Sequence, residues 1–357
     1  MTKRRTTRAA AVDLFCGAGG LTRGLLDAGV KVIAGYDIDD SCKFAYEENN
    51  EGVRFRNESV ADLRADELAR LYPKGHTRVL VGCAPCQTFS KYTQGLRQAN
   101  DPKWKLLTQF ARLIRELKPA VVSMENVPEL ASYRVFYRFL SVLREEGFYF
   151  VQDPEKWVVY CPDYGVPQNR RRLVILASRL GPIELIPPTH RPERYLQVRD
   201  AIEKLPPLRP GEICKTDPLH RSASLTERNL RRIRASKPGG TWRDWPAALR
   251  ADCHKGKAGK TYPSVYGRME WDKPSPTITT QFYGYGSGRF GHPQQDRGLS
   301  LREGALLQSF PKSYQFVEPG AEYSFKGVGR LIGNAVPVRL GVAIGKSITK
   351  HVSEYER

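Results

Sequence analysis

Short apolar runs alternate with amphipathic segments through the first half of the chain. The runs predict buried strands at 10–15, 31–36, 53–60, 79–81, 120–124, 157–160 and 173–177. Apolar positions three and four residues apart predict helices between them, at 21–28, 62–71, 106–117 and 133–147. Strands that alternate with helices are typical of an α/β fold with a doubly wound, mostly parallel sheet.

The pattern changes after residue 177. From 178 to about 262 the chain is rich in proline and arginine and has no regular apolar period. The aromatic and glycine-containing segment 262–291 indicates a loop-rich β region, and helical patterns return after residue 299. We therefore expect a first domain built from 1–177 and 299–357, with a smaller, loop-rich β domain at 178–298.

Residues with chemical function directly follow four of the predicted strands. They are the glycine-rich turn Cys16–Gly20, Asp37, Cys86 and Glu125. Because the carboxyl ends of parallel strands meet at one edge of a sheet, we expect these residues to converge. A glycine turn lets backbone N–H groups approach a ligand, and an acid about 20 positions later can bond a ribose diol. Dehydrogenases share this pattern, and a tight turn followed by a solvated acid remains an alternative.

The charge balance favours a polyanionic partner. The formal net charge is +19, and residues 168–260 alone carry 21 basic and 9 acidic residues, a net of +12. A basic run usually marks a solvated face, but an excess over a whole segment favours phosphate contacts. A membrane surface is the weaker alternative, since no apolar run approaches the roughly 20 residues that span a bilayer. The basic segment Met1–Arg8 is predicted to be a disordered arm rather than a secretory signal.

The seven cysteines are scattered over the chain, which favours a reducing cytoplasm over a disulfide framework. Cys83 and Cys86 have CxxC spacing, yet no second CxxC or HxxxH pair completes a zinc site. A zinc deaminase would also need an HxE motif. We therefore expect no metal, and taken alone Cys86 is ordinarily interpreted as a buried thiol.

The combination of residues at the sheet edge suits group transfer onto a nucleobase. A thiolate can add to an electron-poor carbon. A neighbouring carboxyl can hydrogen-bond a ring nitrogen and make that carbon electrophilic, and arginines can hold a carbonyl oxygen or phosphates.

The chain resembles the cytosine-C5 DNA methyltransferases over nearly its whole length, in the order of that family's motifs. The matching stretches are DLFCGAGG at 13–20, PCQ at 85–87, ENV at 125–127, QNRRR at 168–172, RE at 302–303 with LQSFP at 307–311, and GNAVP at 333–337. The family's fold, with an S-adenosylmethionine-binding sheet domain and a smaller target-recognition domain at 178–298, is what the resemblance implies.

The resemblance also implies catalytic roles. Cys86 would add to C6 of a cytosine flipped out of the helix, Glu125 would engage N3, and Arg172 would hold the O2 edge. Arg170 and Asn126 would brace the cysteine loop. Cys83 would then be a packing residue of the turn, and its CxxC spacing incidental.

The cofactor implied by the resemblance is S-adenosyl-L-methionine. Its binding residues would come from the glycine turn, the tips of the strands and the closing motif: Phe15, Gly17, Gly19, Gly20, Asp37, Ile38, Ser59, Pro85, Asn334 and Val336. Ser59 is a departure, because the family often has an acid at this place to read the adenine amino group.

Double-stranded DNA is the implied substrate. Residues expected to contact it are Ser90, Gln94, Arg97, Thr277 and Ile278. An ordinary edge strand after a proline is the alternative interpretation of residues 276–279. We further expect a monomeric bacterial enzyme of the cytoplasm, associated with the nucleoid through DNA, with no membrane contact and a functional pairing with a restriction endonuclease rather than a stable complex with it.

Three rival functions are open at this level. RNA cytosine-C5 methylation, as in a tRNA-modifying relative, uses the same chemistry, although the large basic insert favours DNA. A non-catalytic DNA-binding relative usually lacks the cysteine or the acid, and both are present here. A nicotinamide oxidoreductase would explain the glycine turn but nothing after residue 60.

Overall fold

The computed structural model describes residues 8–85, 104–256 and 264–355. Two compact units are present. The first comprises Met1–Tyr164, Arg171–Thr189 and Val336–Arg357, and the second comprises Gly165–Arg170 and His190–Ala335.

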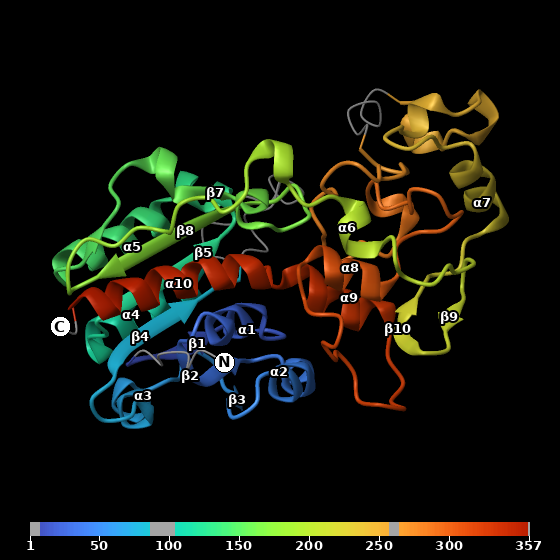
Figure 1. Cartoon of the computed structure of the whole chain (residues 1–357). Helices are drawn as coiled ribbons and strands as arrows, with labels where there is room; N and C mark the ends of the chain where they lie inside the picture. The colour runs from blue at the N-terminus through green and yellow to red at the C-terminus, as the bar shows by residue number, and fades with distance from the viewer. Residues whose placement is uncertain (1–7, 86–103, 257–263, 356–357) are drawn as a thin grey trace. The chain divides into compact units, whose positions relative to one another are not determined.

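An eight-stranded sheet forms the centre of the first unit (Figure 1). Its strands are β1 (Ala9–Leu14), β2 (Lys31–Asp37), β3 (Arg54–Asn57), β4 (Thr77–Gly82), β5 (Val121–Asn126), β6 (Tyr149–Phe150), β7 (Val158–Tyr160) and β8 (Arg171–Ser178). The order is β3-β2-β1-β4-β5-β8-β6, with β7 also paired to β8. The predicted strands of the first half are therefore confirmed, as is the doubly wound α/β class.

The directions of the strands decide which residues lie at the same edge of the sheet. β3, β2, β1, β4 and β5 pair in parallel, whereas β8 runs antiparallel to β5. The glycine turn, Asp37 and Glu125 consequently lie at the same edge of the sheet as the residues 83–85 that follow β4, while the predicted Cys86 lies outside the described residues. The start of β8 reaches this edge too, because β8 runs in the opposite direction.

Helices connect the strands and complete the unit. They are α1 (Gly20–Asp27), α2 (Lys43–Asn49), α3 (Ala65–Leu71), α4 (Trp104–Leu117), α5 (Arg134–Glu145) and α10 (Val338–Tyr355). The sequence pattern predicted α1, α3, α4, α5 and the last helix but not the short α2. β3 is shorter than the predicted 53–60, because turn bonds to Arg56 and Ser59 carbonyls follow it directly.

Glycines allow α1 and α10 to approach each other closely. A Cβ atom on Gly24 would lie 2.5 Å from the Val338 carbonyl oxygen and 2.5 Å from the Gly341 carbonyl carbon. A side chain at Gly24 would therefore push the two helices apart.

The segment Phe325–Tyr355 is long and apolar enough to cross a membrane by length and composition alone, with a mean hydropathy of 1.2. However, 72% of that window is buried inside the protein, as in a core helix.

The second unit has little regular structure. It contains α6 (Val198–Ile202), β9 (Ile213–Cys214), β10 (Asp217–Arg221), α7 (Glu227–Arg234), α8 (Leu301–Leu307) and α9 (Phe325–Asn334). In the part of 262–291 that the structure describes, the β-contacts are isolated bridges, such as Arg268 with Gly291. The predicted loop-rich character is thus present, with β9–β10 as the hairpin. α8 and α9 belong to this unit, and the domain roles assigned to 178–298 and 299–357 stay a prediction.

A buried ion pair fixes the start of α8. Arg297 and Glu303 are fully buried and form two hydrogen bonds of 2.8 and 2.7 Å. Ser300 caps the helix, with its backbone N–H donating to Glu303 and its hydroxyl accepting from the Glu303 N–H. Burial alone would raise the pKa of Glu303, but the Arg297 charge and hydrogen bonds lower it to about 2.

His292 adjoins this pair as a neutral ring. Burial lowers its pKa to about 4 against an opposing effect of Glu303, and Arg297, Arg268 and His220 also disfavour its charge. Its Nδ1 accepts hydrogen bonds from the backbone N–H groups of Gln294 and Gln295. Protonation at Nδ1 would remove both bonds.

We expect the second unit to lose stability in acid in two steps. The His292 pKa is lower in the folded protein, so the unfolded chain binds the extra proton and stability falls as pH drops from about 6.5 to about 4. The stability that the ionised Glu303 carboxylate contributes is lost at lower pH, as pH falls from about 4.5 toward about 2. Urea unfolding between pH 7 and pH 4 measures the first step. His292→Asn should flatten it, whereas the partly exposed His76→Asn should not. An identical pH slope in His292→Asn and the unaltered protein would contradict this assignment.

Candidate active site

The ends of β4 and β5 are tied together by side chains. The pairing of Gly82 with Met124 places Cys83 and Ala84 beside Glu125 and Asn126. Asn126 Nδ2 donates to the Ala84 carbonyl oxygen at 2.9 Å, and Cys83 Sγ donates to Glu125 Oε2 at 2.7 Å. The turn that leads to Cys86 is therefore attached to the tip of β5.

Arg172 at the start of β8 completes the setting of Glu125. Its Nε lies 2.9 Å from Glu125 Oε1, and the two side chains are only 13% and 2% exposed. Within the described part of the chain this ion pair is the contact made by Oε1, which receives no hydrogen bond. One buried carboxylate oxygen thus faces a cation while retaining the capacity to bind a further polar group.

The predicted site residues Cys86, Ser90, Gln94 and Arg97 lie outside the described residues. Pro85, the last described residue before Cys86, is partly exposed.

Asp37 organises the glycine turn. Its Oδ2 accepts from the Gly17 N–H at 2.9 Å, and its Oδ1 accepts from the Asp39 N–H at 3.0 Å. Gly17 and Gly19 have φ values of 51° and 85°, a conformation that glycine adopts without strain. Burial raises the pKa of Asp37, and these backbone hydrogen bonds oppose the rise. Asp37 thus shapes the turn, and each oxygen keeps a lone pair for another donor.

Other predicted residues surround the turn. Phe15 has φ 58°, and Gly20 begins α1. Ile38 is 75% exposed, an unusual setting for an isoleucine, and its carbonyl accepts from Asn57 Nδ2 at 3.0 Å. Ser59, in the turn after β3, accepts from the Ala61 N–H at 3.2 Å. An apolar side chain is therefore presented to solvent beside the glycine turn.

Asp13 was not singled out from the sequence. It is 1% exposed on β1, and burial raises its pKa to about 7 against a hydrogen bond from Thr22. Its Oδ1 has no hydrogen-bond partner within residues 8–85, 104–256 and 264–355. An acid inside an apolar strand was the available signal for a functional or strained position.

The remaining predicted residues of the second unit form a buried network around Gln168. Gln168 Oε1 accepts from the Ile278 N–H at 2.8 Å, and its Nε2 donates to Gln308 Oε1 at 2.9 Å. Arg170 donates to the Ile278 and Ala335 carbonyls at 3.1 and 3.4 Å. The predicted role of Arg170 at the cysteine loop stays a prediction.

The two predicted DNA-contacting residues of this unit differ in exposure. Thr277 is partly exposed and donates to the Asn169 carbonyl, whereas the Ile278 side chain is fully buried. Of the two cofactor residues in the closing motif, Asn334 ends α9 with its side chain exposed, and Val336 is 5% exposed just before α10.

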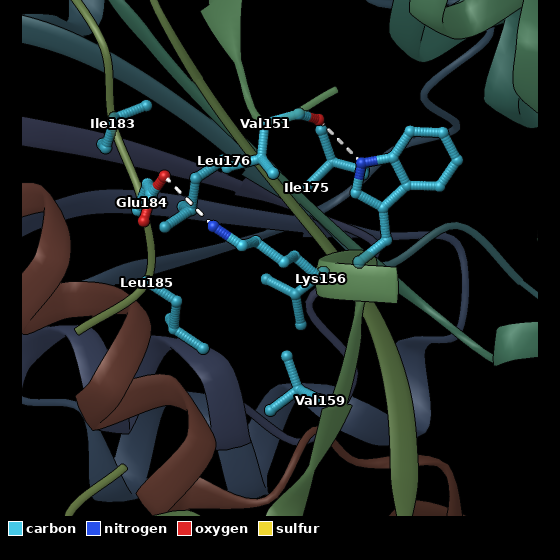
Figure 2. Close-up of a pocket in the computed structure, with 10 residues that line it drawn as sticks. Val151, Lys156, Val159, Ile175, Leu176, Ile183, Glu184 and Leu185 are labelled. Carbon is cyan, nitrogen blue, oxygen red and sulfur yellow. Dashed lines mark hydrogen bonds and ion pairs between the residues drawn. The ribbon is translucent and has the colours of Figure 1, made fainter. Parts of the chain in front are cut away.

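One cavity away from this edge of the sheet is too small for a substrate. Figure 2 shows this cavity, lined by Val151, Val159, Leu176, Leu185 and their neighbours, where Lys156 lies 3.9 Å from Glu184. It encloses about 30 Å³, which accommodates a water molecule rather than a nucleoside. No cluster of three or more metal-binding side chains occurs among the residues whose structure is described.

Comparison with known proteins identifies the family to which this chain belongs. Residues 9–350 match the family model of the C-5 cytosine-specific DNA methylases. The chain belongs to this family, and it is a DNA (cytosine-5-)-methyltransferase.

Individual relatives extend over nearly the whole chain. The Type II methylase M.HgiDII of Herpetosiphon aurantiacus is 54% identical over 344 residues, covering 96% of this chain and 95% of the relative. The Type II methyltransferase M.Eco47II of Escherichia coli is 31% identical, covering 94% of this chain and 78% of the relative.

Solved structures support the fold. A prophage-encoded methyltransferase of E. coli has a TM-score of 0.73 at 19% identity, with 96% of this chain and 99% of that chain covered. The Dnmt2 methyltransferase of S. pombe has a TM-score of 0.59 at 15% identity, with 98% and 100% covered. These likenesses establish the methyltransferase fold of the chain.

We expect Asp37→Ala to loosen the glycine turn specifically. Loss of the hydrogen bond to the Gly17 N–H should speed hydrogen exchange of that amide by about fivefold, since one such bond contributes about 1 kcal/mol. Exchange measured by NMR or mass spectrometry tests this. Asp39→Ala is the matched control, because Asp39 accepts from Ser41 instead. Unchanged exchange at Gly17 in Asp37→Ala would refute the role.

Proposed function

We propose that the chain methylates C5 of a cytosine flipped out of duplex DNA, with Cys86 as nucleophile, Glu125 at N3 and Arg172 at the O2 edge. The observation that carries the proposal is the position of Glu125. It is buried, paired with Arg172 and bonded to the turn that immediately precedes Cys86. A carboxyl and a nucleophile would thereby meet one base from adjacent strands.

The chemistry follows from these positions. The Cys86 sulfur forms a bond to C6 while Glu125 hydrogen-bonds N3, and the electron pair of the C5–C6 double bond becomes available at C5. After methyl transfer to C5, loss of the C5 proton and departure of the Cys86 thiolate restore the double bond. Base flipping is required, because C5 and C6 cannot be approached from the needed face within the stack.

S-adenosyl-L-methionine, the methyl donor that we propose, supplies an electrophilic methyl group. The residues near the glycine turn fit such a cofactor. The exposed Ile38 offers an apolar face to an adenine ring, and Asp37 keeps lone pairs for ribose hydroxyls. Ser59, Pro85, Asn334 and Val336 remain proposed members of the site.

DNA is the substrate of this family, and we propose that residues 178–298 read its sequence. Residues 1–177 and 299–357 would form the catalytic domain. The Type II names of the relatives support a functional pairing with a restriction endonuclease. We further propose a monomer located in the bacterial cytoplasm, where its DNA lies.

Helix α7 suits phosphate contacts in that recognition segment. Arg228, Arg231 and Arg234 recur every three residues, and all three side chains are exposed. Arg232, in contrast, is 6% exposed and lies over the rings of Trp245 and Tyr266 at 5.4 Å. The helix is thus fixed by one arginine, and three others form a basic outer face.

We expect Cys86→Ala and Cys86→Ser to abolish methyl transfer while cofactor binding is preserved. Glu125→Gln should lower kcat by about 100-fold, as loss of a general acid does. Transfer of labelled methyl groups to genomic DNA and to total tRNA, with calorimetric cofactor binding, measures both effects. Substantial turnover by Cys86→Ala would exclude Cys86 as the nucleophile. Label found only in tRNA would exclude DNA as the substrate.

We expect replacement of Arg228, Arg231 and Arg234 by glutamine to reduce the salt dependence of DNA binding. Each lost phosphate contact should lower the slope of log affinity against log salt by about 0.9. Fluorescence anisotropy at salt concentrations from about 50 to about 200 mM measures this slope. Exposed basic residues of the first unit, Lys31, Lys43 and Arg54, changed together to glutamine, form the control. Equal slopes in the α7 variant and the unaltered protein would remove α7 from the interface.

A further inference from the structure

Cys83 makes a contact that a packing residue does not need. Its Sγ lies 2.7 Å from Glu125 Oε2, well inside the van der Waals separation of a sulfur and an oxygen, and the thiol therefore donates to the carboxylate. The sequence predicted only a packing role for Cys83. The structure places its thiol on the carboxyl group that the proposed chemistry uses.

We propose that Cys83 is a positioning residue that orients the Glu125 carboxyl for catalysis. This inference rests on the proposed role of Glu125. A carboxyl held at one oxygen can rotate about the Cγ–Cδ bond, whereas contacts at both oxygens fix its plane. Arg172 lies at Oε1 and Cys83 at Oε2, one from each neighbouring strand.

Strand geometry explains why a short side chain carries this contact. Neighbouring strands are about 4.8 Å apart, so a side chain with one heavy atom beyond Cβ spans the gap between β4 and β5. The residue before it is Gly82, where an added Cβ would lie 3.1 Å from the Leu14 carbonyl oxygen and 3.2 Å from a Phe110 ring carbon. The tight packing at Gly82 leaves little freedom to Cys83, which keeps its sulfur directed at β5.

A thiol also suits a carboxyl group that must form a hydrogen bond to the base and release it again. It is a weaker donor than a hydroxyl, so it orients Oε2 without binding it as strongly as serine would. Oε1, which accepts no hydrogen bond among the described residues, is left to meet the base.

The experiment is a double-mutant cycle between Cys83 and Glu125, read in kcat and KM for DNA. Cys83→Ala should lower kcat by about tenfold, the effect of one charge-assisted hydrogen bond, with KM for DNA and cofactor within about twofold. Cys83→Ser should recover most of kcat. In a Glu125→Gln background, Cys83→Ala should cause no further loss, because the carboxyl group that Cys83 orients has been replaced by an amide.

Controls separate positioning from packing. Cys161→Ala removes a different thiol, a fully buried one at the end of β7, and should leave kcat within about twofold. Thermal unfolding and cofactor binding of each variant establish that it is folded.

Each outcome has a defined consequence. An equal loss of kcat from Cys83→Ala in both backgrounds, or a serine variant no better than alanine, would overturn the positioning role. Full activity of Cys83→Ala with a strong effect of Glu125→Gln would overturn it as well, while leaving the proposed function intact. Full activity of Glu125→Gln would instead reject the proposed role of Glu125 itself.

Discussion

The site depends on the direction of the two strands that flank β5. β4 runs parallel to β5, so the residues after both strands emerge together, and β8 runs antiparallel, so its first residues arrive at the same place. A carboxyl at the end of β5 thereby meets the turn that follows β4 on one side and an arginine at the start of β8 on the other. Reversal of either neighbour would separate Glu125 from its partners.

The sequence predicted much of this arrangement for identifiable reasons. Buried strands of a parallel sheet are continuous apolar runs, which end visibly where Gly82 or Glu125 follows. The parallel alternation then implied that the tips share an edge. Motif resemblance supplied the partners Glu125 and Arg172, whose positions 47 residues apart could not be paired from periodicity alone.

Other features could not be predicted, because they depend on contacts distant in sequence. α9 has glycines at 327, 329 and 333, which weaken its helical pattern, yet Cβ atoms at 329 and 333 would collide with Tyr283 and Thr279. The thiol contact of Cys83 resembles simple packing until the neighbouring strand is placed. In the second unit, the start of α8 is fixed by the buried Arg297–Glu303 ion pair, which an apolar sequence pattern does not reveal.

The close approach of α1 and α10 has a consequence for how the protein is made. Leu21 and Leu25 on α1 are buried, and the residues of α10 that cross Gly24, Val338 and Gly341, follow it by more than 300 positions in the sequence. During synthesis the helix behind the glycine turn therefore lacks its packing partner until residues near 341 have been added. Contacts of such long sequence separation slow folding, so the nascent chain exposes apolar surface until α10 has been synthesised and is then most vulnerable to aggregation and proteolysis.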